Sequence, residues 1–146
     1  MPLVRLLYAS DAVGILPYST LVGIMTHAQQ RNPTRGITGM LCYGSGQFLQ
    51  VLEGDREPVN RLYHAIARDT RHERCELLSV SEVDRRDFPE WSMKVVNWED
   101  GDAARRRALL EGETGSAVFN PRALSADQAI SFLRHLAELE RELASE

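Results

Sequence analysis

The chain has 146 residues, of which 43% are hydrophobic and 26% charged, and its formal net charge is −4. This length accommodates one domain with a short appendage, and the composition is ordinary for a globular protein. The acidic balance argues against a nucleic-acid binder, and no apolar run approaches the roughly 18 residues of a membrane span. The N-terminus also lacks a basic and then apolar leader, so we expect a cytoplasmic protein that does not bind membranes.

Hydrophobic periodicity predicts that strands and helices alternate over the first hundred residues. Period-two patterns predict strands over Leu3–Ser10, Gly36–Tyr43, Gln47–Glu53, Cys75–Val83 and Met93–Trp98. Helical spacing of apolar residues predicts helices over Thr20–Gln30 and Asp55–Asp69. The order β-α-β-β-α-β-β is typical of an α+β, ferredoxin-like fold, in which two helices cover one face of the sheet.

The C-terminal part is expected to be helical and to cover the other face of the sheet. A short helix is predicted over Asp102–Glu111 and a longer one over Ser125–Ala144, whose apolar stripe runs from Ala126 to Leu143. The stripe fits a helix docked on its own domain, and it also fits pairing with another subunit or a partner; Glu140 interrupts it. We therefore divide the chain into a first domain, residues 1–100, and a C-terminal helical extension, residues 101–146.

Several common kinds of site receive no support from the sequence. Cys42 and Cys75 lie far apart and are interpreted as free thiols rather than a disulfide or a metal pair. The run Gly44–Gly46 begins like a dinucleotide fingerprint, but a strand follows where that fingerprint requires a helix. The four histidines are scattered without ligand spacing, so we expect no metal site.

Gln50 is the most informative residue of the chain. Alternation places it on the same strand face as Phe48 and Leu52, inside the fold. A buried amide costs about 1–3 kcal/mol if its hydrogen bonds are not met. Tyr8 is the matching polar residue on the inner face of the first strand. A phenol and an amide directed into one interior indicate a polar ligand.

Further polar residues lie at the predicted helix ends. Asn32 follows the first helix, and the cluster Arg68–His72 follows the second. A flat ligand between the two helices would contact these groups at its rim and Ile24 and Ile66 as apolar walls. Periodicity alone favours plain core packing for the two isoleucines, and a solvated helix end is the simpler interpretation of the basic cluster. The residues themselves therefore lead only as far as a polar planar ligand.

Five runs of sequence resemble a known family. They occur in order within residues 1–98, as Arg5–Ser10, Asn32–Leu41, Phe48–Gly54, Ile66–His72 and Phe88–Met93. Together with the combination of Tyr, Asn, Gln and Trp-x-Met, these runs resemble the BLUF domains, which are blue-light sensors that use flavin. The resemblance implies a stand-alone photosensory module, which performs no turnover, with a C-terminal helical extension.

The resemblance also implies a noncovalently bound flavin, usually FAD, with FMN or riboflavin as alternatives. Its ring would lie between the two helices, with Asn32 on the pyrimidine edge and Gln50 bridging Tyr8 and the flavin. The other implied cofactor contacts are Ile24, Arg31, Phe48, Ile66, Arg68, Asp69, Arg71 and His72. Arg31 stands where relatives often carry Asn or His, and Ala28 replaces a hydroxyl residue found in some of them.

The resemblance to this family also implies a signalling mechanism. Blue light would drive an electron and then a proton from Tyr8 to the flavin, and Gln50 would be left rotated or tautomerised. Trp91 and Met93 are expected to alternate onto one face of the last strand and to exchange access to Gln50. The C-terminal helices would then alter self-assembly, as a homo-oligomer (a dimer or larger), or engagement of a downstream protein partner. Removal of the residues beyond Asp100 should leave the spectral response and abolish signalling.

Two other functions fit a ferredoxin-like fold. An acylphosphatase-like hydrolase requires an anion-binding loop after the first strand, but the run Asp11–Ile15 is acidic and apolar. An RNA-recognition module requires exposed aromatic residues on the first and third strands, and the apolar Leu49 and Val51 face argues against it.

Overall fold

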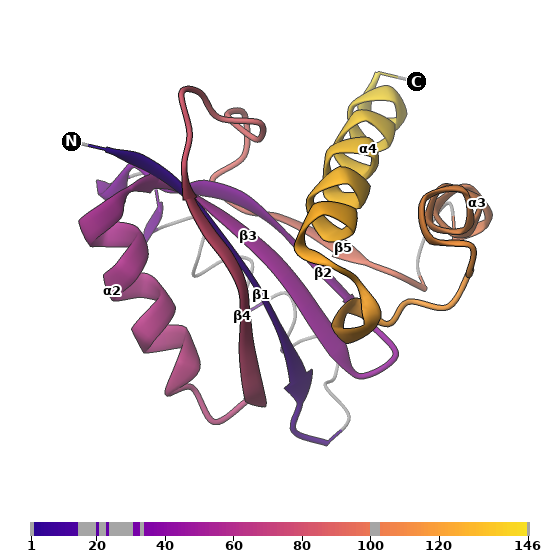
Figure 1. Cartoon of the computed structure of the whole chain (residues 1–146), viewed down its shortest axis with the longest axis horizontal. Helices are drawn as coiled ribbons and strands as arrows, with labels where there is room; N and C mark the ends of the chain where they lie inside the picture. The colour runs from indigo at the N-terminus through magenta and orange to yellow at the C-terminus, as the bar shows by residue number, and fades with distance from the viewer. Residues whose placement is uncertain are drawn as a thin grey trace.

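The computed structural model describes residues 2–14, 20, 23, 31–32, 34–99 and 103–145. Its centre is a five-stranded sheet of order β4-β1-β3-β2-β5, with helices on both faces (Figure 1). The strands are β1 Leu3–Ala12, β2 Thr38–Gly44, β3 Gln47–Asp55, β4 His72–Glu82 and β5 Lys94–Asn97. Only β2 and β5 pair in parallel, and the other neighbours are antiparallel. The predicted α+β, ferredoxin-like fold is confirmed.

Helix α2, Arg56–Ala67, covers the inner face of the sheet (Figure 1). Its Val59 is buried among inward-facing strand residues such as Leu6, Leu41 and Leu52. The predicted helix over Thr20–Gln30 lies outside the described residues, apart from Thr20 and Gly23, which are helical. Ile24 and Ala28 are therefore also outside the described part of the chain.

The outer face is covered by helix α4, Ala126–Ala144, with helix α3, Ala103–Thr114, beside it (Figure 1). Helix α4 begins with a capping box between Ser125 and Gln128, in which each side chain bonds the other residue's backbone N–H. A short 3-10 turn, Pro121–Ala123, precedes it. The buried face of α4 comprises Ala129, Phe132, Leu133, Leu136, Ala137 and Glu140.

The outer cluster formed by α4 and the sheet decides between the two interpretations of the apolar stripe. Phe132, Leu133 and Leu136 pack with Leu49 and Val51 of β3 in one buried cluster. The apolar stripe of α4 is therefore buried against the sheet of its own chain. Glu140, which interrupts the stripe, is paired with the buried Arg106 of α3 at 3.0 Å.

The remaining negative expectations are tested only where the structure describes the chain. Cys42 is buried and Cys75 half-buried, and both are free thiols. Among the described residues, no group of histidine, cysteine or acidic side chains could hold a metal ion. Likewise, none of the described helices is both long and apolar enough to span a bilayer.

Candidate functional site

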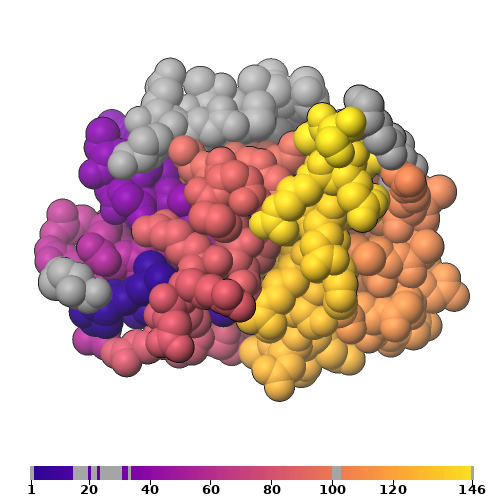
Figure 2. All heavy atoms as spheres, turned by 90° about the horizontal axis from the view of Figure 1, so that it is seen from above, coloured from indigo at the N-terminus to yellow at the C-terminus, as the bar shows by residue number. Residues whose placement is uncertain are grey.

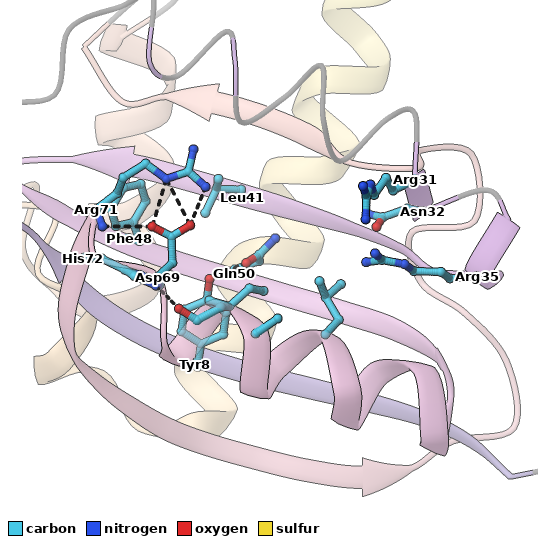
Figure 3. A pocket seen from close by; sticks show the side chains of 13 residues that line it. Tyr8, Arg31, Asn32, Arg35, Leu41, Phe48, Gln50, Asp69, Arg71 and His72 are labelled. Atoms are coloured by element: carbon cyan, nitrogen blue, oxygen red, sulfur yellow. Dashed lines mark hydrogen bonds and ion pairs between the residues drawn. The ribbon is translucent and has the colours of Figure 1, made fainter.

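A cavity of about 240 Å³ lies on the inner face of the sheet beside α2 (Figure 3). Its lining comes from four strands (β1, β2, β3 and the first residue of β4), from α2 and the short link that follows it, and from three helical residues that precede β2. The lining residues are Tyr8, Arg31, Asn32, Arg35, Leu41, Phe48, Gln50, Leu62, Ala65, Ile66, Asp69, Arg71 and His72.

Tyr8 and Gln50 form the floor of the cavity. They are direct cross-strand partners in the register of β1 and β3, and are only 2% and 6% exposed. The Tyr8 hydroxyl donates to Gln50 Oε1, and Gln50 Nε2 donates to Met93 Sδ at 3.3 Å. Burial raises the pKa of Tyr8 well above its usual value, so the phenol keeps its proton and acts as the donor. One N–H of the carboxamide remains available to a ligand.

One end of the cavity is built from a compact polar network (Figure 3). The Arg71 guanidinium donates from Nε to both Asp69 carboxylate oxygens at 3.0 Å, and its backbone N–H donates to Oδ1 at 2.9 Å. These hydrogen bonds lower the pKa of Asp69, which keeps the carboxylate charged. The pair is therefore locally neutral.

His72 closes the same end through two hydrogen bonds of its ring. Nε2 contacts the backbone carbonyl of Ile66, and Nδ1 lies 2.9 Å from the Ser10 hydroxyl. Because a carbonyl oxygen only accepts, the first contact requires the proton on Nε2. With the proton on Nε2, Nδ1 can accept from the Ser10 hydroxyl, and the two contacts together hold the orientation of the ring.

The opposite end is formed by Arg31, Asn32 and Arg35, which Figure 3 shows grouped together. Asn32 is 2% exposed and donates from Nδ2 to the carbonyl of Ser92 at 2.7 Å. Its backbone carbonyl accepts from the N–H of Ile37 at 3.0 Å. Asn32 therefore joins the cavity to the segment that carries Met93.

Trp91 and Met93 do not share a face, contrary to the sequence-based expectation. Met93 is 1% exposed and belongs to the inner cluster, in contact with Gln50. Trp91 packs against the outer cluster, with the Arg141 guanidinium 5.2 Å from its ring centroid. The alternation rule fails because β5 begins at Lys94, so both residues precede the strand.

Close approach of this segment to the sheet depends on one glycine. Gly39 donates its N–H to the Trp91 carbonyl at 3.1 Å. A Cβ at this position would lie 2.0 Å from the Val51 carbonyl oxygen and 3.3 Å from Met93 Cε. Only glycine therefore lets β2 lie this close both to β3 and to the segment that carries Met93.

The cavity contains most of the contacts inferred from the family resemblance. Arg68 is an exception, because it caps the C-terminal end of α2 and lies outside the lining. Ile24 falls outside the described residues. The sequence analysis missed Arg35, Leu41, Leu62 and Ala65. Leu41 and Leu62 lie on periodic inner faces and could have been found there, whereas Arg35 has no periodic signal.

This lining suits a flat heteroaromatic ring with a hydrogen-bonding edge. Phe48, Leu62 and Ile66 supply apolar surface, while Gln50 and Asn32 supply buried amide groups. Mostly apolar walls with a few convergent polar groups are typical of a cofactor site. A flavin ring has both features, so the residues present fit this group.

Comparisons with known proteins agree with the site. The family model "Sensors of blue-light using FAD" matches residues 3–94. The structure resembles the photo-activated state of BlsA, with a TM-score of 0.81, 33% identity, and coverage of 92% of this chain and 94% of that one. It also resembles the dark state of the BLUF protein BlrB, with a TM-score of 0.76, 30% identity, and coverage of 92% and 93%.

A curated relative is much longer than this chain. The alpha subunit of photoactivated adenylate cyclase from Euglena gracilis is 42% identical over 71 residues, which are 48% of this chain and 7% of the subunit. The hydrolase alternative gains no support from these comparisons. The chain belongs to the BLUF family of flavin-binding, blue-light photosensory domains.

Proposed function

We propose that the ring of FAD binds noncovalently in this cavity and that Tyr8 and Gln50 are its photochemical partners. The observation that carries the proposal is their buried hydrogen bond on the cavity floor. FAD is favoured by the family description, and FMN and riboflavin share the same ring. Phe48, Ile66 and Ile24 would flank the ring, with Asp69, Arg71 and His72 at its polar end.

A bound flavin supplies absorption of blue light and, once excited, an acceptor for an electron. Tyr8 is the residue placed to give up the electron, because its hydroxyl already donates to Gln50 Oε1. Loss of the electron would make the phenol strongly acidic, so its proton would move along this bond; Tyr8 would recover both an electron and a proton when the charges recombine. Gln50 then has two arrangements, one that accepts from Tyr8 and one that is rotated or tautomerised. In a low-dielectric site these arrangements differ enough to act as a two-state element.

The output route begins at Met93, the second partner of Gln50. A changed Gln50 amide alters this contact and with it the β4–β5 segment, residues 83–93, in which Trp91 and Met93 are proposed to exchange places. Arg141 of α4 contacts this segment at Trp91, at the Asp87 carbonyl and at the Glu90 carboxylate. Residues 1–100 would thus act as the sensor and residues 101–146 as the output region.

The expected receiver of the signal is a second copy of the chain, as a dimer or larger assembly, or a downstream protein partner in the cytoplasm. Among the curated relatives, the photoactivated cyclase subunit extends far beyond the matched region. This supports signalling from the sensor to an effector.

A visible spectrum of the purified protein tests the proposal. We expect flavin absorption that shifts slightly to the red under blue light and returns in the dark. Chromatography of the released chromophore identifies FAD, FMN or riboflavin. A protein that stays colourless after incubation with an excess of all three flavins contradicts the proposal.

A further inference from the structure

The end of the cavity at Asn32 carries positive charge without a matching acid. Arg31 and Arg35 both line it and lie beside the Asn32 amide in Figure 3. Within the part of the chain that the structure describes, neither guanidinium forms an ion pair. Among the described residues of the lining Asp69 is the one carboxylate, and it is bound to Arg71 at the opposite end.

Asn32 indicates which part of a flavin would occupy this end. One proton of its Nδ2 goes to the Ser92 carbonyl, and the described residues provide no partner for its second proton or its Oδ1. The side chain is 2% exposed and lines the cavity. A carboxamide that presents a donor beside an acceptor complements an imide, O=C–N–H. The pyrimidine edge of the flavin ring is such an imide, so its carbonyl groups would lie near the two arginines.

Two like charges one helical turn apart repel each other. Oxidised flavin has a neutral ring, which leaves this repulsion in place. When the ring takes up electrons, negative charge spreads over N1 and the pyrimidine carbonyls, where a nearby cation is stabilising. The charge arrangement of this end therefore favours the reduced ring over the oxidised one.

We infer that Arg31 and Arg35 form a cationic rim that stabilises negative charge on the pyrimidine ring and thereby sets the reduction potential of the bound flavin. This inference rests on the proposed flavin site. It assigns a role to Arg35, and it gives Arg31 a role directed to the ring rather than to a phosphate. The electrons in light come from Tyr8, and in the test below they come from dithionite.

The test measures the two-electron midpoint potential of the bound flavin in Arg31→Gln, Arg35→Gln and Arg35→Lys. Each variant is loaded separately with riboflavin, FMN and FAD, and its affinity for each oxidised flavin is measured by fluorescence quenching. Arg107→Gln is the matched control, because it removes one arginine on α3, on the other side of the sheet, where Arg107 pairs with Glu99.

We expect both glutamine variants at the rim to lower the potential, with Arg35→Lys and Arg107→Gln close to the wild-type protein. A roughly tenfold loss of affinity for the reduced ring relative to the oxidised ring corresponds to about 30 mV. The shift should be the same with riboflavin, which has no phosphate, as with FMN and FAD.

Three results would overturn the inference. The first is an unchanged midpoint potential in both glutamine variants. The second is an effect confined to FMN and FAD, which would assign the arginines to the phosphate. The third is a complete loss of oxidised riboflavin binding, which would mean that the neutral ring itself requires the cationic rim. A wild-type protein that binds none of the three flavins would instead overturn the proposed function itself.

Discussion

Gln50 has to satisfy more than one neighbour with a single amide. Tyr8 occupies its oxygen and Met93 one of its N–H groups, so rotation of the amide disturbs both contacts at once. Because both partners are buried, a lost hydrogen bond cannot be replaced by water. A rotation of the Gln50 amide therefore changes the free energy of its contacts with both Tyr8 and Met93.

Replacement of either photochemical residue should separate flavin binding from the light response. In Gln50→Leu and Tyr8→Phe the cavity keeps its apolar walls, so we expect the flavin to remain bound. The reversible red shift should be lost, because the first variant removes the amide and the second removes the proton donor. Light-minus-dark absorption spectra measure this, and a normal photocycle in either variant contradicts the assigned roles.

Asn32→Ala should weaken flavin retention. The change removes an amide that faces the cavity and also leaves the carbonyl of the half-buried Ser92 without this donor. A hydrogen bond of this kind contributes about 0.5–1.5 kcal/mol, so we expect a roughly three- to tenfold weaker affinity. The ratio of flavin to protein absorbance after purification gives the first reading. Retention equal to the wild-type protein would remove Asn32 from the site.

At the scale of elements, the β4–β5 segment is held between the sheet and α4. Glu53 of β3 is fully buried and accepts from the backbone N–H groups of Asp87 and Phe88 at 2.9 Å. On the other side, Arg134 of α4 bonds Asp87 at 2.5 Å. Figure 2 shows α4, in yellow, lying directly against the salmon-coloured residues that include this segment. A displacement of Met93 can therefore reach α4 through the direct contacts of the β4–β5 segment with this helix.

Arg141→Gln should uncouple α4 from the photochemistry. The change removes the cation over Trp91 and the ion pair with Glu90 at 2.6 Å, and it touches nothing in the cavity. We expect the red shift to persist, and the light-induced change in hydrogen exchange of residues 126–144 to shrink. Arg107→Gln serves as the control for loss of a surface charge. An undiminished exchange response in Arg141→Gln would mean that the signal reaches α4 by another route.

The contact between α3 and α4 depends on a buried ion pair. Arg106 bonds Glu140 and also donates to the Asn97 carbonyl at the end of β5 at 3.2 Å. In Arg106→Leu the Glu140 carboxylate remains buried and keeps Lys94, at 3.9 Å, as a cationic partner. Removal of one partner of a buried ion pair destabilises a protein by about 3–5 kcal/mol, which is the upper bound here. The double change of both residues to leucine should recover most of that loss, because no charge is left in the interior. Urea unfolding of the single and double variants compares the two.

Sequence patterns succeed where an element is regular and fail where it is not. Tyr8 and Gln50 lie in the middle of long strands, so period two identifies their shared inner face. Trp91 and Met93 lie in an irregular segment before a strand of four residues. In such a segment, a spacing of two residues does not indicate that the side chains share a face. Arg35 lies at the end of a helical region, and its approach to the cavity depends on tertiary packing that no local pattern encodes.

At the scale of the whole molecule, the two faces of the sheet have different tasks. The inner face carries the cavity, and the outer face carries most of the large buried side chains, including Phe88, Phe119 and Phe132. The sequence predicted that C-terminal helices cover this outer face, but the apolar stripe alone left two possible partners. A stripe has the same composition whether it packs on its own sheet or on another subunit, so only the tertiary structure distinguishes the two.

Removal of residues 101–146 tests which partner the stripe has in solution. The sequence predicts that the shortened chain keeps its spectral response and loses signalling. The structure adds a further consequence, because Met40, Leu49 and Val51 of the outer face would become exposed to water together with Trp98. Burial of one such side chain is worth about 1.5–3 kcal/mol, so the shortened chain should be less stable and should associate.

Size-exclusion chromatography and thermal unfolding of the two chain lengths therefore give opposite results for the two interpretations. If α4 protects its own sheet, the shortened chain forms larger species and unfolds at a lower temperature than the full chain. If the stripe instead joined subunits, its removal would yield a smaller, well-folded species. A shortened chain that is monomeric and unfolds at the original temperature would contradict the packing of α4 on the sheet, and with it the route from Met93 to α4.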